Sequence, residues 1–196
     1  YRMNVQLTDK KEVIFESALE LLQDQGFHGT PMSQIATKAN ISVGSIYHYF
    51  ESKEALIIEL YSYCKCKLML DLFDGLTKDN QNYEQHFKIV WKRFVQFYLT
   101  HPHYFRFLNQ FYSSPFHEME RLKKEELKTV ETTGIQRFLE AGREANILRN
   151  TSTPILCAAF TGVAVSFVKA ILFGKVDMQA QQTEEMVDIV WKSIKA

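Results

Sequence analysis

The placement of proline restricts this chain more than any other feature of its sequence. The 196 residues contain eight glycines and only four prolines, Pro31, Pro102, Pro115 and Pro154, and most of these prolines directly follow a serine or threonine. Proline is tolerated at the first position of a helix, where its missing amide proton would have no partner. Ser or Thr is favoured at the position before it, where its side chain caps the helix. No proline interrupts a run with helical periodicity. We therefore predict an all-α protein.

Hydrophobic periodicity and capping residues predict about nine helices. The expected ranges are Thr8 to about Gln23, Pro31 to Ala39, Val43 to Phe50, Lys53 to about Phe73, Tyr83 to Thr100, Pro102 to Tyr112, Pro115 to about Ala141, Pro154 to Phe173 and Ala180 to Lys195. Short helices give way to long ones near Ser52. We therefore expect a domain over residues 1–52, followed by a larger helical domain over residues 53–196.

The composition indicates a globular protein but does not show what kind of partner it binds. Apolar residues make up 46% of the chain and charged residues 23%, which is typical of a globular domain and excludes a disordered chain. The 23 basic residues balance the 23 acidic ones, so the net charge neither favours nor excludes a nucleic-acid partner. The three cysteines and the absence of a secretory apolar segment near residue 1 indicate reduced thiols in a cytoplasmic protein.

Residues 30–50, TPMSQIATKANISVGSIYHYF, predict a helix-turn-helix. Two short helices flank residues 40–42, and Asn40 is the non-glycine residue best suited to the left-handed backbone of a sharp reversal. Apolar side chains that can fix the crossing of the two helices are Ile35, Ala36, Ile41, Ile46 and Phe50. The second helix of such a pair can enter the DNA major groove. A helical hairpin without a ligand is the alternative.

The second helix carries side chains suited to DNA. Its first turn, residues 42–45, is small enough for a close approach, and its exposed amides attract phosphate. Tyr47, His48 and Tyr49 carry groups that reach phosphates or base edges. Residues 1–53 contain five Lys or Arg against six Asp or Glu. We therefore expect DNA affinity to rely on amides and hydroxyls more than on a basic patch, and to depend weakly on salt.

This stretch resembles the DNA-binding domain of the TetR family of bacterial transcriptional regulators. The matching residues are Gly26-Phe27, Thr30, Ile35-Ala36, Ala39, Ile41-Ser42, Gly44, Tyr47, Phe50, Lys53 and Leu56. The chain departs from the family at Asn40, where glycine is usual, and at Tyr49, where histidine is frequent. The resemblance implies phosphate contacts by Thr30, Tyr47, Tyr49 and Lys53, and positions near the bases for Ser42, Val43, Gly44, Ser45 and His48. It also implies an operator-binding homodimer with a C-terminal regulatory domain.

Aromatic residues are concentrated in the centre of the chain. Residues 91–116 hold ten of the 26 aromatic residues, and Trp91, Phe94 and Tyr98 share one helix face. Such a stripe forms either a packed core or an apolar cavity for a small molecule, and both interpretations stay open. TetR-like regulators typically bind an inducer there. The expected lining of an effector site is Trp91, Phe94, Tyr98, Phe105, Leu108, Phe111, Phe138, Phe160 and Phe167.

The last two helices predict a homodimer. Ala158, Gly162 and Ser166 are spaced four apart and form a ridge that permits close packing of another helix. The final helix offers Met186, Val187, Val190, Trp191 and Ile194 on one side, and together the two helices expose too much apolar surface for a monomer. Residues 151–168 are uncharged, but Lys169 and interspersed polar residues favour a helix buried on most sides over a membrane span.

We expect a ligand-responsive transcriptional regulator, a repressor released from its operator by a hydrophobic small molecule. A helical protein-binding module and a small all-α enzyme are the alternatives. No nucleophile–base motif, glycine-rich phosphate loop or paired-carboxylate signature predicts catalytic residues or a cofactor. The histidines lack metal-ligand spacing, so no metal is expected. Cys64 and Cys66 face different sides of a helix, which favours ordinary packing over a redox role.

Overall fold

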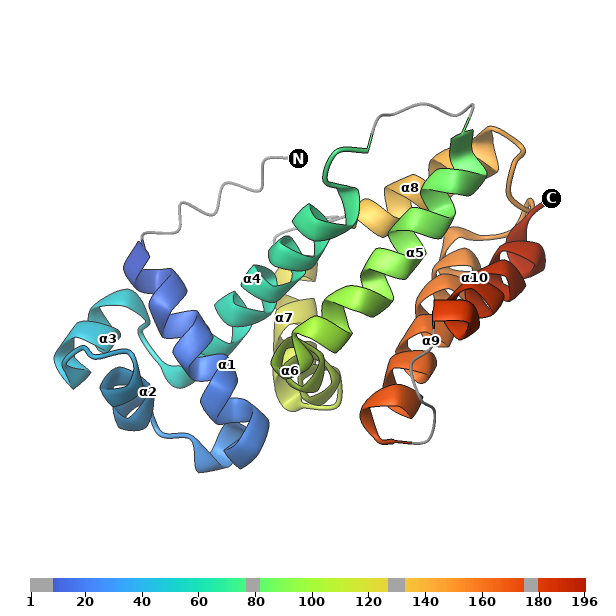
Figure 1. The fold of residues 1–196 in the computed structure, drawn as a ribbon. Helices are drawn as coiled ribbons and strands as arrows, with labels where there is room; N and C mark the ends of the chain where they lie inside the picture. Colours follow the sequence, from blue (N-terminus) through green and yellow to red (C-terminus); the bar gives the residue numbers. More distant parts are fainter. Residues whose placement is uncertain (1–8, 77–81, 127–132, 175–179) are drawn as a thin grey trace. The chain divides into compact units, whose positions relative to one another are not determined.

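The computed structural model describes residues 9–76, 82–126, 133–174 and 180–196, and these segments form ten α-helices (Figure 1). The helices are α1 (Asp9–Gly29), α2 (Met32–Lys38), α3 (Val43–Tyr49), α4 (Lys53–Phe73), α5 (Tyr83–Thr100), α6 (Pro102–Tyr112), α7 (Pro115–Glu126), α8 (Gly134–Glu144), α9 (Thr153–Leu172) and α10 (Ala180–Ile194). The predicted all-α class is confirmed. Thr8, the expected first cap, lies outside the described residues.

The long helix predicted from Pro115 to Ala141 is wrong, because α7 and α8 stand in its place. The hydroxyl of Thr133 accepts a hydrogen bond from the Gln136 amide at 3.2 Å, and the Gln136 side chain accepts one from the Thr133 amide at 2.7 Å. This reciprocal capping box starts a new helix at Gly134. The helical periodicity continues across residues 115–141, which hid a start signal present in the sequence.

Packing divides the chain into two compact units. Unit 1 spans residues up to 67 together with 101–130, and within it α1 packs on α2 and α6, α2 on α3, and α6 on α7. Unit 2 spans residues 68–100 and 131–196, and within it α5 packs on α9 and α10, while α8 packs on α9. Helix α4 contributes residues to both units. The boundary predicted after residue 52 divides the chain by function and stays a prediction.

A polar network joins α1, α4 and α6 inside unit 1. The Tyr63 hydroxyl donates to Glu16 Oε1 at 2.6 Å, and the Tyr104 hydroxyl donates to the same oxygen at 2.5 Å. Burial raises the pKa of both tyrosines, so they remain neutral donors. Lys67 Nζ donates to Glu12 Oε1 at 2.5 Å and holds the pKa of that carboxyl below its usual value. The network fixes α1, which leads into the helix-turn-helix.

The core of unit 2 contains most of the apolar stripe of α10. Val187, Val190, Trp191 and Ile194 are all buried, and the Trp191 ring lies 5.2 Å from that of Phe87. The prediction that this stripe lies on a dimer face is therefore wrong, because α5 of the same chain covers it.

Helix α9 differs from α10, because much of its apolar surface is left uncovered by the described residues. Only 28% of its most apolar 18-residue stretch is buried, so the prediction that it is buried on most sides is wrong for a single chain. Ile155 is 59% exposed, and the predicted ridge of Ala158, Gly162 and Ser166 is exposed as well. By length and composition alone, α9 is also the one helix among the described residues that could cross a membrane.

Candidate nucleic-acid interface

The turn between α2 and α3 has the geometry predicted for it. Asn40 adopts a φ of 53°, in the left-handed region, and the Ile41 amide donates to the Ala36 carbonyl at 3.0 Å. Ile35, Ala36, Ile46 and Phe50 are buried. These contacts fix α3 against α2, so the direction in which α3 presents its outer side is determined by the core beneath it.

The first turn of α3 faces outward. Residues 42–45 are all exposed, and Val43 retains 44% of its accessible surface. The Ser42 side chain caps the helix by accepting from the Ser45 amide at 3.1 Å, and the two serine hydroxyls lie 2.8 Å apart. A Cβ added at Gly44 would meet only Ser42 Oγ, at 3.9 Å. This turn therefore presents small, hydroxyl-bearing side chains over a rigid backbone.

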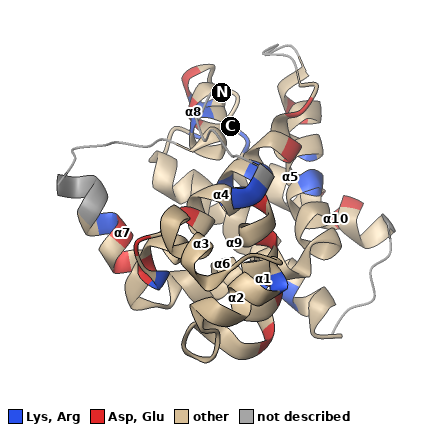
Figure 2. Cartoon of the chain, turned by 90° about the vertical axis from the view of Figure 1, so that its left-hand side faces the viewer, with Lys and Arg blue, Asp and Glu red and all other residues tan. Residues whose placement is uncertain are grey.

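The aromatic residues of α3 continue this surface. Tyr47 is 51% exposed, His48 is exposed and Tyr49 is half-buried. The rings of His48 and Tyr49 lie 5.9 Å apart, edge to face. Helix α3 has no charged residue, and in Figure 2 it is drawn entirely in tan. The outer side of α3 therefore offers hydroxyl and imidazole groups, and any Lys or Arg near it belongs to another helix.

The structure gives Thr30 and Lys53 different surroundings. Thr30 is fully buried, and its hydroxyl donates to the Gly26 carbonyl at 3.0 Å. The single hydroxyl proton of Thr30 is used in this bond at the end of α1, so in this conformation the hydroxyl has no proton left to donate to a phosphate. Lys53 is half-buried at the start of α4, directly after Ser52, whose hydroxyl caps that helix by accepting from the Ala55 amide at 3.1 Å.

Carboxylates of α1 and α4 pair with several lysines of unit 1. Lys11 lies 2.8 Å from Glu59, and Lys38 lies 2.5 Å from Glu20. Lys67 is held by Glu12, as described above. Among residues 10–67, the described side chains provide no ion pair or aromatic contact for Lys10 and Lys53. The cationic groups available to an external anion are therefore few.

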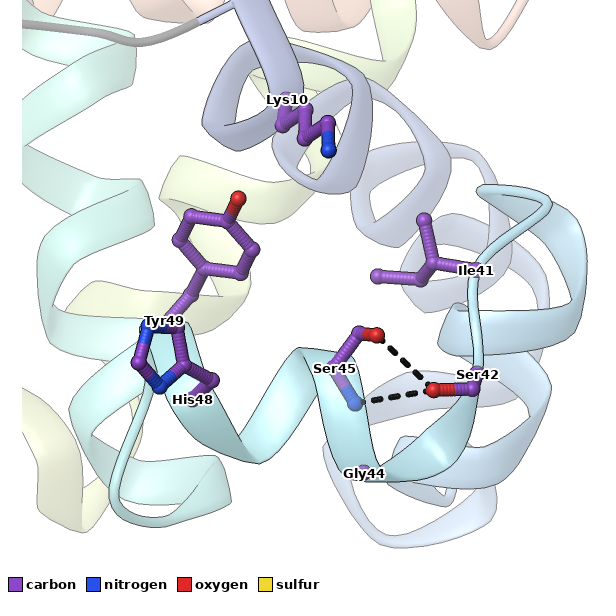
Figure 3. Close-up of a pocket in the computed structure, with 7 residues that line it drawn as sticks. All are labelled: Lys10, Ile41, Ser42, Gly44, Ser45, His48 and Tyr49. Atoms are coloured by element: carbon purple, nitrogen blue, oxygen red, sulfur yellow. Dashed lines mark hydrogen bonds between the residues drawn. The ribbon is translucent and has the colours of Figure 1, made fainter.

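An open hollow of about 410 Å³ lies beside α3 (Figure 3). Its lining residues are Lys10, Ile41, Ser42, Gly44, Ser45, His48 and Tyr49. Five of them are predicted DNA contacts. Lys10 and Ile41 are not, and sequence reasoning missed Lys10 because a lysine in the first turn of an amphipathic helix is indistinguishable from any solvated charge.

The predicted effector residues belong to two units. Trp91, Phe94, Tyr98, Phe138, Phe160 and Phe167 lie in unit 2, and Phe105, Leu108 and Phe111 lie in unit 1. All are buried except Phe138, which is half-buried. In unit 2, Trp91 Nε1 donates to the Phe160 carbonyl at 3.2 Å, and the Phe94 and Phe160 rings lie 6.0 Å apart. In unit 1, Phe111 stacks on Tyr61 at 4.2 Å.

None of these aromatic residues lines the hollow beside α3 or a second hollow in unit 2. The second hollow, of about 480 Å³, is lined by Asn82, Glu84, Gln85, Lys88, Ile89 and Lys92 of α5 and the residue before it. There Lys88 pairs with Asp188 of α10 at 2.8 Å and lowers the pKa of that carboxyl. Among the described residues, no three His, Cys, Asp or Glu side chains form a group that could hold a metal ion. Cys64 is buried, and burial raises the pKa of its thiol.

Two protein families match separate parts of this chain. The family described as bacterial regulatory proteins, tetR family, matches residues 14–60. The family described as Tetracyclin repressor-like, C-terminal domain, matches residues 82–195. A HTH-type transcriptional regulator of Haemophilus influenzae is 23% identical over 188 residues, 96% of this chain and 97% of that protein.

Solved structures have the same fold. A TetR-family transcriptional regulator from Haemophilus influenzae superposes with a TM-score of 0.81 at 21% identity, covering 96% of this chain and 97% of the other. The fatty acid degradation regulator FadR from Bacillus halodurans superposes with a TM-score of 0.72 at 16% identity, covering 95% of each chain. These similarities extend over both units rather than the helix-turn-helix alone.

Proposed function

The chain belongs to the TetR family of bacterial transcriptional regulators, and on that premise we propose that it is a cytoplasmic repressor that a hydrophobic small molecule releases from operator DNA. Its relatives are transcriptional regulators rather than enzymes. The observation that carries the proposal is the outward first turn of α3, capped by Ser42 and followed by the exposed Tyr47.

In this proposal α3 enters the major groove of operator DNA. Ser42, Val43, Gly44, Ser45 and His48 approach the bases, and Tyr47, Tyr49 and Lys53 contact phosphates. The small side chains of the first turn support a close approach, since the exposed backbone there carries no bulky group. Thr30 has a supporting role, because its buried hydroxyl stabilises the turn that leads into α2.

The proposed dimer uses the uncovered side of α9, together with the outer side of α10. Ile155 and the small residues Ala158, Gly162 and Ser166 form an apolar, low-relief surface against which a helix of a second copy can pack closely. Ile189, 61% exposed, extends apolar surface onto α10. A two-fold dimer presents two α3 helices to the two halves of a pseudopalindromic operator.

The proposed effector is hydrophobic and binds among those predicted aromatic residues that belong to unit 2. Support comes from their apolar surroundings and from a fold neighbour that is named as a regulator of fatty acid degradation. Binding there requires a conformation in which these packed rings separate. The effector therefore selects a conformation that is more open than this structure.

Helix α4 is the proposed lever between effector and DNA. Within unit 1, Tyr63 and Lys67 of α4 bond to Glu16 and Glu12 of α1. Within unit 2, the Arg93 guanidinium of α5 donates to the Asp74 carbonyl, just past the end of α4, at 2.7 Å. In this proposal a displacement of α5 is passed to α4 through the bond from Arg93 and on to α1 through the bonds of Tyr63 and Lys67, and it changes the separation of the two α3 helices.

A mobility-shift titration with duplex DNA from upstream of the protein's own gene tests this function. Wild-type protein is expected to bind, and Tyr47→Ala to bind more weakly while its circular dichroism and molar mass are unchanged. Equal binding by both would remove Tyr47 from the interface. Failure of the wild type to bind would contradict the proposed function.

The effector is tested separately with saturated fatty acids and other lipophilic compounds. Trp191→Phe leaves Trp91 as the only tryptophan, so its fluorescence reports on the proposed site. Binding is expected to change this fluorescence and raise the melting temperature. Saturable binding that changes neither would place the ligand elsewhere.

A further inference from the structure

We infer that Lys10, at the start of α1, and Tyr49, at the end of α3, together bind one backbone phosphate of the operator in the hollow beside α3. The inference rests on the proposed DNA-binding function and adds Lys10, which neither the resemblance nor the sequence pattern assigns. It also gives Tyr49 a partner at the position where the chain departs from the family's usual histidine.

The geometry of the hollow carries this inference. Lys10 and Tyr49 both line it, although they come from different helices. Figure 3 shows the Tyr49 ring extending from α3 toward α1, with its hydroxyl on the side of Lys10 and with Gly44 at the opposite end of the hollow. A phosphate at the Lys10 end would therefore meet an ammonium and a phenol from two sides.

The charges around the hollow favour an anion. Lys10 supplies its only ammonium group, and none of the seven lining residues is acidic. By contrast, the adjacent Lys11 is neutralised by Glu59 at 2.8 Å and lies over the Phe50 ring. Lysine ammonium and tyrosine hydroxyl groups are both donors that commonly contact DNA phosphates, and such contacts do not depend directly on the base sequence. A phosphodiester therefore matches this pair.

The distinguishing variant is Lys10→Gln, and its matched control is Lys11→Gln. Both remove one positive charge from neighbouring positions, so effects of net charge on DNA affinity are shared. A dimer loses two phosphate contacts with Lys10→Gln, so its affinity should fall on the order of 10-fold and its logarithmic salt slope should become shallower by about 2. Lys11→Gln should leave the salt slope unchanged and the affinity within about two-fold of wild type.

A double-mutant cycle tests whether the two residues share a phosphate. Tyr49→Phe removes only the hydroxyl, and the combination with Lys10→Gln should lose less affinity than the product of the two single losses. Losses that multiply would show independent contacts and overturn the shared phosphate. Circular dichroism and melting temperature verify that each variant is folded.

These measurements distinguish failure of the shared phosphate site from failure of the proposed DNA-binding function. If wild-type protein binds operator DNA and Lys10→Gln behaves like Lys11→Gln, the inference is overturned and the proposed function stands. If the wild type binds no duplex, both fall. A shallower salt slope for Lys10→Gln alone, together with a less than multiplicative double variant, supports the shared phosphate.

Discussion

Helices α3 and α9 both leave much of their surface uncovered, but the exposed chemistry differs. In α3 only Ile46 is buried, and apart from Val43 the exposed side chains carry hydroxyl, imidazole and phenol groups. In α9 the exposed side chains include Ile155 and a ridge of small residues that contains Ala158 and Gly162. Unpartnered polar surface on a fixed helix suits a hydrated polyanion, whereas unpartnered apolar surface is costly in water and suits a second protein surface.

This difference assigns the two helices separate partners. In the proposed function, α3 contacts DNA and α9 contacts another copy of the chain. A substitution in α3 is therefore expected to weaken DNA binding without changing self-association. Because operator binding uses two copies of α3, a defect at α9 still reaches DNA affinity through the loss of the second half-site contact.

The largest effect is expected from Gly162→Leu. A Cβ at Gly162 meets no described atom within 4 Å, so the chain tolerates a side chain there, but a second helix packed on the ridge does not. Light scattering should show a monomer at micromolar concentration, and operator affinity should fall on the order of 1000-fold. Gly162→Ala is the control and should remain dimeric. A Gly162→Leu protein with the mass of a dimer would contradict the assignment of α9.

Salt dependence measures how much of the α3 contact is ionic. Lys10 and Lys53 provide two unpaired lysines in each subunit, or four in a dimer, which gives a logarithmic salt slope of about −4 and roughly a 100-fold loss of affinity between 50 and 200 mM salt. Fluorescence anisotropy across this range measures the slope. A slope steeper than about −8 would mean that basic groups outside this count dominate.

Removing a single hydroxyl from α3 should have a smaller effect. Tyr47→Phe should weaken operator binding on the order of 10-fold, because a solvent-exposed hydrogen bond with a net value of about 0.7 kcal/mol is lost in each subunit. Tyr112→Phe is the matched control, since Tyr112 is 53% exposed against 51% for Tyr47 but lies on α6. Comparable losses in both variants would argue against a specific phosphate contact by Tyr47.

The smallest expected effect is a pH dependence of unit 1, which carries α3. Burial lowers the pKa of His103 below its usual value of 6.5, although Glu16 opposes that shift. The unfolded chain therefore binds more protons in this range, and the free energy of unfolding falls as the pH drops through about 6.5. His103→Gln should flatten this dependence in urea titrations between about pH 7.5 and 5.5. An unchanged pH dependence would exclude His103 as its source.

The helix-turn-helix could be predicted from the sequence because its determinants are local. Asn40 permits the reversal, Ser42 caps α3, and the spacing of Ile46 and Phe50 marks the inner side. The apolar faces of α9 and α10 could not be distinguished in the same way. Both have helical periodicity and both pack on α5, and only the tertiary structure shows that the stripe of α10 is buried while α9 keeps Ile155 exposed.

Individual site residues were predictable only where their role is local. Thr30 precedes a proline, which is common at a helix start, but its burial and its bond to the Gly26 carbonyl are visible only in the folded chain. Lys10 faces α3 across the hollow from another helix, and no spacing along the chain indicates that relationship. The predicted effector residues share a helical stripe, yet the units to which they belong are determined by tertiary packing.

Footprinting on DNA upstream of the protein's own gene tests most directly whether two copies of α3 read one duplex. The account predicts two protected half-sites related by symmetry, with centres about 10 base pairs apart or a multiple of that distance, and loss of both with Tyr47→Ala. A single protected site without symmetry, or protection unaffected by Tyr47→Ala, would contradict it.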